Sequence, residues 1–399
     1  MTWQPLVTGD KRVAIERVLR EIVAAIAAIP PATLLDHIDR ATLRAYLAQE
    51  DVIPDPDDVA LDSLAKGVAM FTREPTQAAL FGGAAGLGWC LAHVGGDETA
   101  DRVCAAIDQV LARRVAAWDG DYDLIAGLAG IGVYALARGE VGVPLATSIV
   151  ERLAHLALPR RGGLAWHTPP ERLAPWQRTG APRGVWNLGL SHGAAGVIAL
   201  LARLVAIPRA RELLEHAMIF QRSIEGPLDA RYPAWLIGGP DEPEHAGATS
   251  SRLAWCYNDL GVAFAILAAG RATNNPAWCA DALALARDCA GRTGDRAKLD
   301  DAGLCHGYFG AAHLFQRLHH ATGEVCFADA ARRWLAHGLA TRDDRPVAGF
   351  PRKLGEAPDD WMADASLLTG AAGVALALHA MITSVEPGWD QLLLIDLAP

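Results

Sequence analysis

Residues 190–202 read LSHGAAGVIALLA, a turn with two glycines followed at once by an apolar segment. The pattern recurs as FGGAAGLGWCLA at 81–92, LIAGLAGIGVYALA at 124–137, WCYNDLGVAFAILA at 255–268, LCHGYFGAAHLF at 304–315 and LTGAAGVALALHA at 368–380. Each copy contains Gly-x-x-Gly, except that the fourth has Asn258 in place of the first glycine. One pattern recurring through a chain predicts a repeat architecture, here with an apolar helix that opens on each turn.

The glycines predict tight turns and close packing between the helices that begin on them. Asparagine tolerates a left-handed backbone best after glycine, so we expect Asn258 to keep the turn. Segments such as VIALLA and VALALHA are apolar nearly all round, which predicts an inner layer of fully buried helices. The intervening segment 208–220 carries charge on one face, which predicts an outer layer.

Helix pairs that repeat without strand signals predict an all-α fold, as a stacked or closed helical array. We expect an α/α toroid, a double-layered barrel of inner and outer helices that forms a single domain over residues 1–399. Residues 1–75 are expected to supply outer helices, and the Gly-x-x-Gly repeats cover about 80–380. All turns would then lie at one rim. A plain helical solenoid with structural glycine turns is the alternative that the repeat alone leaves open.

The composition, 51% hydrophobic and 21% charged over 399 residues, is typical of a globular protein. A formal net charge of −10 argues against nucleic-acid binding, which needs a clustered basic surface. The apolar run at 22–30 is too short to span a bilayer, and no secretory signal is evident. Seven cysteines, an odd number, disfavour a disulfide framework. These features predict a cytoplasmic protein that is not embedded in a membrane.

The fourth and fifth turns carry three candidate metal ligands, Cys256, Cys305 and His306. Each cysteine lies two residues before the first motif position of its turn, Asn258 or Gly307, so the two thiols occupy equivalent places. Zinc prefers thiolate and imidazole ligands, and three protein ligands leave a fourth position open for catalysis. An isolated cysteine is more often a packing residue, but the equivalence of these two favours a site for one Zn²⁺ per chain.

Three further side chains with useful chemistry accompany the turns. His192 occupies the place in the third turn that His306 has in the fifth, and an imidazole titrates near neutral pH, which suits proton transfer. A histidine that caps an inner helix is the alternative. Asp123 of the second turn could orient His192 or cap its own helix. Arg252, four residues before Cys256, could hold an anionic carbonyl or make a surface ion pair.

Tryptophans crowd the loops ahead of the turns, at Trp166, Trp176, Trp186 and Trp235. So many aromatic side chains predict a cleft for an extended, peptide-like ligand. Simple coverage of the rim of the ring is the alternative.

Three motifs in this order, Ser-His-Gly-x-x-Gly at 191–196, Trp-Cys-Tyr at 255–257 and Cys-His-Gly at 305–307, resemble the lanthionine cyclases, the LanC-like family. The resemblance covers about 80–379 and implies a toroid of seven inner and seven outer helices, one pair more than the six copies found. Asn258 departs from the family's usual glycine. The positions that match the family's zinc ligands are Cys256, Cys305 and His306, and those that match its active-site residues are His192, Asp123, Arg252 and Tyr257.

The resemblance implies a stand-alone zinc-dependent lanthionine cyclase, which adds a peptide cysteine thiolate to dehydroalanine or dehydrobutyrine and so forms thioether rings in a lanthipeptide precursor. Its partners would be the dehydrated precursor peptide and a separate dehydratase, and a membrane biosynthetic complex could recruit it peripherally in the cytoplasm. One rival is a zinc protein of the same family that binds glutathione or another thiol without cyclase activity. Another is a zinc toroid such as a protein prenyltransferase subunit, against which the Cys-Cys-His set argues. The presence of His192, Asp123 and Arg252 favours catalysis over binding.

Overall fold

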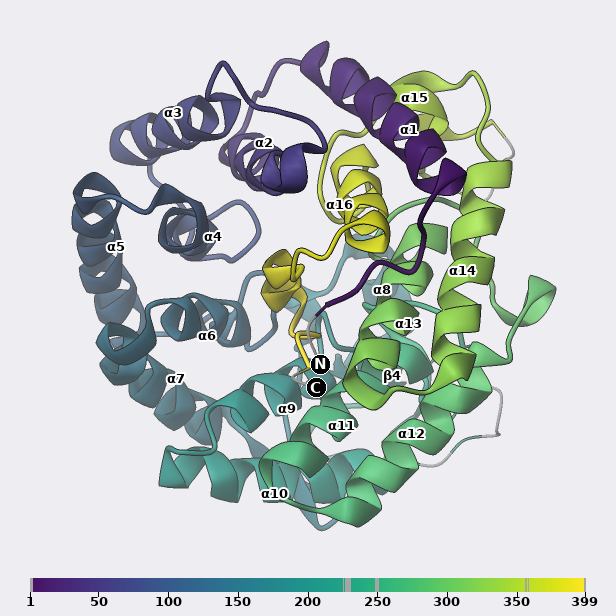
Figure 1. Ribbon diagram of the computed structural model, residues 1–399. Helices are drawn as coiled ribbons and strands as arrows, with labels where there is room; N and C mark the ends of the chain where they lie inside the picture. Colours follow the sequence, from purple (N-terminus) through teal and green to yellow (C-terminus); the bar gives the residue numbers. More distant parts are fainter. Residues whose placement is uncertain are drawn as a thin grey trace.

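The computed structural model describes residues 3–224, 226, 231–247, 251–355, 357 and 359–397. In this part of the chain, the long helices form two concentric rings (Figure 1). The inner ring consists of α2 (Leu34–Leu47), α4 (Ala84–Cys90), α6 (Leu128–Ala137), α9 (Ala194–Arg203), α11 (Asn258–Ala272), α13 (Tyr308–Thr322) and α16 (Ala371–Ile382). The outer ring consists of α1 (Asp10–Ala27), α3 (Val59–Arg73), α5 (Glu98–Ala116), α7 (Val143–Leu156), α10 (Pro208–Arg222), α12 (Pro276–Ala290) and α14 (Val325–Ala340). The prediction of an all-α, double-layered toroid is confirmed.

The chain alternates between the two rings, and each inner helix up to α13 packs against the outer helix that follows it. The last inner helix, α16, packs instead against α1, the first helix of the chain, and against α2. The ring therefore closes where the last inner helix meets the first two helices of the chain (Figure 1). The prediction that residues 1–75 supply outer helices is correct for α1 and α3 and wrong for α2, which lies in the inner ring.

The inner helix α2 has no Gly-x-x-Gly turn. It begins on a capping box, in which the Thr33 hydroxyl accepts a hydrogen bond from the Asp36 N–H and the Asp36 carboxylate accepts one from the Thr33 N–H. Its Leu43 and Leu47 are buried, as the apolar residues of the other inner helices are. A search for glycine turns cannot find this copy, which explains why the sequence yields six.

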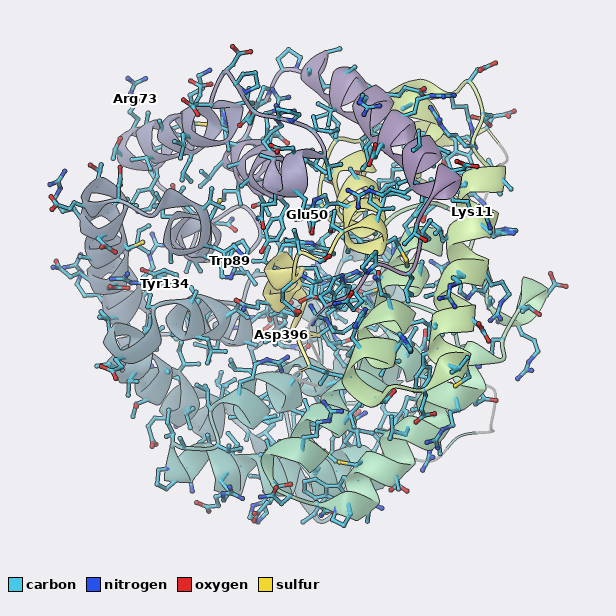
Figure 2. The ribbon with its side chains drawn as sticks, in the orientation of Figure 1. Lys11, Glu50, Arg73, Trp89, Tyr134 and Asp396 are labelled. Carbon is cyan, nitrogen blue, oxygen red and sulfur yellow. The ribbon has the colours of Figure 1, made fainter. Side chains whose placement is uncertain are left out.

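Burial separates the two layers. Every residue of the inner helix α16 is buried, whereas only a stripe of the outer helix α5 is, with Ala100, Cys104, Ile107 and Leu111 at helical spacing. Figure 2 shows Arg73 of the outer helix α3 at the periphery and Trp89 of the inner helix α4 well inside the ring. The patterns of hydrophobicity that predict an inner and an outer layer are therefore those of the structure.

The motif glycines are required by close backbone contacts and not by a left-handed backbone. Gly193, the first glycine of its copy, has an extended backbone (φ −136°), but a Cβ there would lie 2.6 Å from the Gly189 nitrogen. A Cβ on Gly196 would lie 2.2 Å from the Leu190 carbonyl oxygen. The second kind of contact recurs in all six copies, with the carbonyl six residues before the second glycine. The absence of a side chain lets each turn fold tightly onto the start of its helix.

Asn258 differs from the glycines at this place in both its backbone and its contacts. Its backbone is left-handed (φ 68°), as predicted, although the glycines that it replaces are extended. Its Oδ1 accepts a hydrogen bond from the Arg252 N–H (3.3 Å), and its Nδ2 donates one to the Tyr232 carbonyl (3.1 Å). The asparagine therefore ties the start of α11 to the segment before it and fixes the backbone at Arg252.

A belt of backbone hydrogen bonds joins consecutive turns at one end of the ring. Each acceptor carbonyl lies two residues before the first motif position of the next turn. The bonds, 2.8–3.2 Å long, run from the N–H of one residue to the carbonyl of another: from Phe81 to Ile125, from Leu124 to Ser191, from Ser191 to Cys256, from Trp255 to Cys305, and from Cys305 to Leu368. The Leu367 N–H then donates to the buried Asp39 carboxylate on α2 (2.8 Å), which extends the belt to the copy without a glycine turn. The belt explains why all turns lie at one rim, as predicted.

Short strands occur in the connecting loops of the described chain. They are the hairpin β1 (Leu158–Arg160) and β2 (Gly163–Ala165), the antiparallel sheet β3 (Val185–Asn187), β4 (Trp235–Ile237) and β5 (His245–Ala246), and the pair β6 (Arg352–Lys353) and β7 (Trp361–Met362). The loops also hold the short helices α8 (Pro175–Gly180) and α15 (Pro346–Gly349). In the loops around α8, Leu173, Ala181 and Val185 pack with Trp235 and Ile237 as a small second core. This core fixes the segment that covers the rim.

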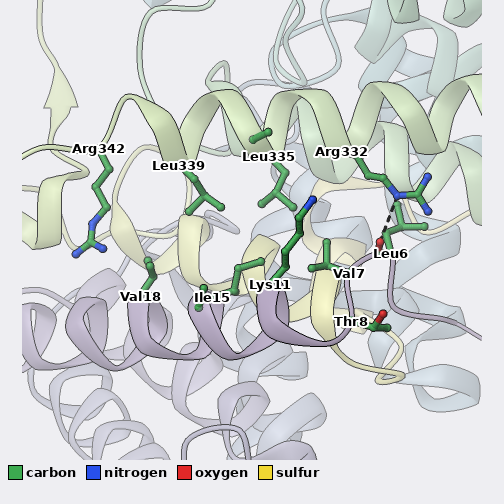
Figure 3. A pocket seen from close by; sticks show the side chains of 12 residues that line it. Leu6, Val7, Thr8, Lys11, Ile15, Val18, Arg332, Leu335, Leu339 and Arg342 are labelled. Atoms are coloured by element: carbon green, nitrogen blue, oxygen red, sulfur yellow. Dashed lines mark hydrogen bonds between the residues drawn. The ribbon is translucent and has the colours of Figure 1, made fainter.

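The C-terminal segment lies in the centre of the ring (Figure 1), where η6 (Gly388–Leu393) and the buried Ile395 follow α16. On the outer wall, a groove of about 630 Å³ runs between α1 and α14 (Figure 3). Ile15 and Leu335 contribute to this groove, which shares no residue with the six turns. Among the described helices, none combines the length and the apolar character that crossing a bilayer requires.

Candidate functional site

The belt brings the predicted metal ligands together. Trp255 of the fourth turn donates to the Cys305 carbonyl of the fifth (3.0 Å), so residues beside them become neighbours. The Sγ atoms of Cys256 and Cys305 and a ring nitrogen of His306 all lie within 4.8 Å of one another. Such separations suit zinc, whose bonds to sulfur and nitrogen are about 2.3 and 2.0 Å. The three residues can therefore hold a metal ion, and they are one ligand short of the usual tetrahedral set.

The charges around this cluster favour metal binding. Hydrogen bonding from Cys305, together with the interaction with His306, outweighs burial and lowers the pKa of the Cys256 thiol well below its usual value. Thiolate is the form that binds a metal. The Asp301 carboxylate is buried, and its Oδ2 lies 3.7 Å from His306 Nε2. A carboxylate beside a ligand imidazole orients the ring and raises its basicity.

His192 and Asp123 form a hydrogen-bonded pair beside this cluster. His192 Nδ1 lies 2.6 Å from Asp123 Oδ2, and the other oxygen of Asp123 accepts a hydrogen bond from the Ala126 N–H (2.9 Å). Asp123 thus both orients His192 and caps its own turn. Burial would lower the pKa of His192, but Asp123 outweighs it and raises this pKa. The His192 side chain is 41% exposed and makes no capping hydrogen bond at the start of α9, so it is available to a ligand.

The other two predicted residues, Tyr257 and Arg252, lie at the same rim. The Tyr257 ring stacks against His192, with centroids 6.0 Å apart. Burial raises the pKa of Tyr257, so its hydroxyl stays neutral. Arg252 is half-buried, and its positive charge acts on Cys305 and His306. The structure therefore brings all seven predicted site residues together.

A cavity of about 430 Å³ opens beside His192 and Tyr257. Trp176 and Trp235 line this cavity, so the predicted cleft involves two of the four loop tryptophans. The other two were misplaced, because Trp166 and Trp186 are fully buried, and the Trp166 Nε1–H donates to a backbone carbonyl. Tryptophans in loops of this kind serve packing as well as ligand contact, and composition alone does not separate the two uses.

Sequence reasoning missed Asp121 and Asp301. Both lie six residues before the first motif position, the place that Arg252 has in the fourth turn. The backbone carbonyl at this place often accepts a hydrogen bond from an N–H in the first turn of the helix. The Asp301 carbonyl, for example, accepts one from the Tyr308 N–H (2.9 Å). Comparing this place across the six copies would have found them, because it is polar in each: Gln77, Asp121, Asn187, Arg252, Asp301 and Asp364.

Comparison with known proteins bears on this arrangement. A family model described as lanthionine synthetase C-like protein matches residues 41–394, which is most of both rings. The chain belongs to the lanthionine synthetase C-like family. The matched range begins within α2, so it includes the six turns and every residue of the site.

Two relatives of this LanC-like chain have names that refer to nisin. The nisin biosynthesis protein NisC of Lactococcus lactis subsp. lactis is 26% identical over 263 residues, which cover 60% of this chain and 62% of that protein. The match thus spans less than two thirds of the relative. A solved structure of a nisin cyclase has a TM-score of 0.74 and 18% identity, with 97% of this chain and 98% of that chain covered. The toroid is therefore the fold of a LanC-like protein of known structure.

Proposed function

We propose that this LanC-like chain is a zinc-dependent lanthionine cyclase that closes thioether rings in a dehydrated precursor peptide. A cysteine thiolate of the peptide attacks the β-carbon of dehydroalanine or dehydrobutyrine. A sulfur–carbon bond forms while the carbon–carbon double bond becomes single, and the α-carbon then takes up a proton. The thiol has lost one proton and the α-carbon has gained one, so the mass of the peptide does not change.

The observation that carries this proposal is the contact between the metal-ligand turn and the proton-donor turn. The Ser191 N–H and hydroxyl both donate to the Cys256 carbonyl, at 3.1 and 3.2 Å. This double contact holds His192, the next residue, beside the ligand cluster. Ring closure needs the peptide thiolate and a proton donor near each other, and these two turns would supply a metal ligand that holds the first and the side chain that serves as the second.

Cys256, Cys305 and His306 would hold the zinc. Bound zinc would lower the pKa of a coordinated peptide thiol and so supply a thiolate at neutral pH. The protein's part is to hold these three side chains in a fixed arrangement. Asp301 does so for His306, since a neighbouring carboxylate orients the ring.

His192 would donate the proton that the α-carbon needs. Attack at the β-carbon leaves an enolate, whose negative charge lies on the α-carbon and on the adjacent carbonyl oxygen. Asp123 raises the pKa of His192 against the effect of burial, so the imidazole is more fully protonated near neutral pH. The Arg252 guanidinium and the neutral Tyr257 hydroxyl would stabilise the enolate oxygen.

The reaction also defines the partners. Because a dehydroamino acid is consumed, a separate dehydratase must act on serine or threonine residues of the precursor first. We expect both reactions to occur in the cytoplasm, on a precursor that has not yet been exported.

Incubation with a dehydrated, cysteine-bearing peptide tests the proposal. Iodoacetamide labelling and mass spectrometry would follow the free thiol, and we expect it to disappear without a change in peptide mass, much faster than in buffer alone. A thiol that stays free would contradict cyclase activity. If glutathione then binds to the protein at one equivalent per chain, a thiol-binding function would replace it.

A further inference from the structure

The cavity beside His192 lies on the proton-donor side of the site. His192, Asp123 and Tyr257 line it, whereas Cys256 and Cys305 do not. A peptide whose thiol lies at the ligand cluster and whose α-carbon lies at His192 would therefore extend its next residues into this cavity. The cavity should receive the dehydroamino acid side of the substrate, and the thiol side should lie elsewhere.

A line of aromatic rings runs along this cavity from the surface to the proton donor. Trp176 and Trp235 meet edge to face with centroids 6.1 Å apart, Trp235 and Tyr257 do so at 5.8 Å, and Tyr257 stacks on His192 at 6.0 Å. Trp235 is held in place because it belongs to β4 and packs on the small second core. Trp235 therefore fixes the middle of the line, and Trp176, Trp235 and Tyr257 form one aromatic wall of the cavity.

Trp176 is the outermost ring of this wall, and it is 70% exposed. It follows Pro175 in the short helix α8, which holds the indole at the mouth of the cavity. An indole exposed to water gains free energy when an apolar group covers it, and tryptophan is enriched where proteins bind ligands for this reason. An exposed ring beside a fixed one, both lining the same cavity, indicates a binding surface.

The rest of the cavity lining is polar. Arg172 Nη1 lies 3.8 Å from Asp121 Oδ1, and Gln177 and Thr168 line the cavity with them. Burial and the nearby Asp123 charge raise the pKa of Asp121 to about 6. These groups can hydrogen-bond to the amides of a peptide, while the carboxylates disfavour an acidic side chain. The cavity volume of about 430 Å³ is within the range of pockets that bind small ligands or a few residues.

We propose that Trp176 and Trp235 form a specificity subsite, which receives a bulky aliphatic or aromatic side chain directly next to the dehydroamino acid of the substrate. This inference rests on the proposed cyclase function and adds a substrate preference to it. The side chain packs on the two indoles, and the peptide backbone faces the polar lining. Peptides with glycine or an acidic residue at this position gain no such contact.

Four peptides test this subsite. They share one cysteine and one dehydroalanine and carry isoleucine or glycine either directly before or directly after the dehydroalanine. At one of these positions, we expect wild-type protein to close the isoleucine peptide with a kcat/KM about tenfold above that of the glycine peptide, the effect of one apolar side chain in a pocket. The ratio should fall to about twofold in Trp176→Ala and recover in Trp176→Phe.

Leu61→Ala is the matched control, because Leu61 is 50% exposed on the outer helix α3 and lines no part of the cavity. It should leave the ratio unchanged. The subsite is overturned if wild-type protein closes the isoleucine and glycine peptides with equal kcat/KM at both positions, or if Trp176→Ala keeps the full preference for isoleucine. Either result leaves the cyclase proposal standing. Absence of ring closure in every peptide would instead contradict the proposed function, and the subsite with it.

Discussion

At the scale of single residues, His192 takes its properties from the turn on which it lies. The Ser191 contact with Cys256 sets its position, and the 2.6 Å contact with Asp123 sets its orientation and raises its pKa. The same imidazole alone on a helix surface would have neither property. The proton-donor role that we propose for His192 therefore depends on neighbours from two other turns, which the sequence separates from it by more than sixty residues in each direction.

Replacement of His192 should stop ring closure without loss of the metal. We expect His192→Ala to lower kcat by about a hundredfold or more, since a positioned proton donor contributes about 10²–10⁴. Zinc content, measured by plasma mass spectrometry, should not change, because the imidazole is not one of the three ligands. An active variant would assign the proton transfer to another group.

Asp123, which hydrogen-bonds to His192, should set the pH dependence of kcat. A proton donor must be protonated, so kcat should fall as the pH rises through the pKa of His192. Asp123→Asn removes the charge that raises this pKa, so the fall should begin at lower pH than in wild type. Rates measured from pH 5.5 to 9 would check this. A profile that keeps its position in Asp123→Asn would mean that another group supplies the proton.

Asn258 should matter more for stability than a turn residue usually does. Asn258→Ala removes two hydrogen bonds and puts alanine, which tolerates a left-handed backbone less well than asparagine, at this position, so we expect the free energy of unfolding to fall by about 2–4 kcal/mol. Asn258→Gly keeps the backbone accessible and should lose only about 1–2 kcal/mol. Urea unfolding compares the two variants. Equal stability of both would contradict the role given to the left-handed backbone.

At the scale of elements, the belt between turns decides where the site forms. It links an N–H near the first motif position of one turn to the carbonyl at the equivalent place of the next. Residues at one register position of the repeat therefore become neighbours in space. The two thiols and His192 could be predicted from their register alone, whereas Asp301 and Asp121 were missed because their register position was not compared.

The contact between Asp39 of α2 and the Leu367 N–H should make the stability of the protein depend on pH. Burial raises the pKa of Asp39 from 3.8 to about 7. The folded chain then holds a proton that the unfolded chain releases, so the stability from this group is complete below about pH 4 and is lost as the pH rises to about 7. Asp39→Asn cannot ionise, yet its amide oxygen can still accept the bond from the Leu367 N–H. We expect this variant to exceed wild type by roughly 2–4 kcal/mol in unfolding free energy at pH 8, and by less at pH 5.

Urea unfolding at pH 5 and pH 8 checks this prediction. Asp62→Asn is a suitable control, because Asp62 is exposed on the outer helix α3 and lies outside the belt. The control should follow the wild-type dependence on pH. If Asp39→Asn does the same, Asp39 is ionised in the folded protein at neutral pH and its burial has been overcome by other groups.

At the scale of the whole molecule, much of the architecture could be predicted because the repeat is regular. Apolar helices behind glycine turns gave the inner ring, and charged helices between them gave the outer one. The exceptions are local. The inner helix α2 uses a capping box, the turn glycines serve close contacts, and Trp166 and Trp186 lie in the core instead of a cleft. The capping box and the glycine contacts each lie within a few residues, but they are not part of the Gly-x-x-Gly pattern or of its expected left-handed turn. The two tryptophans are buried by contacts with other segments, as Trp186 is by Phe220, which a local pattern does not contain.

The ring brings three candidate metal ligands from two separate turns together, and we propose that they bind one zinc ion. Zinc measured per chain tests it most directly, in wild type, Cys256→Ala and Cys305→Ala, with the exposed Cys326→Ala as the control. We predict close to one zinc per chain in wild type and in the control, and a sharp loss in both ligand variants. Wild-type protein without zinc, or full zinc retention in Cys256→Ala, would contradict the account.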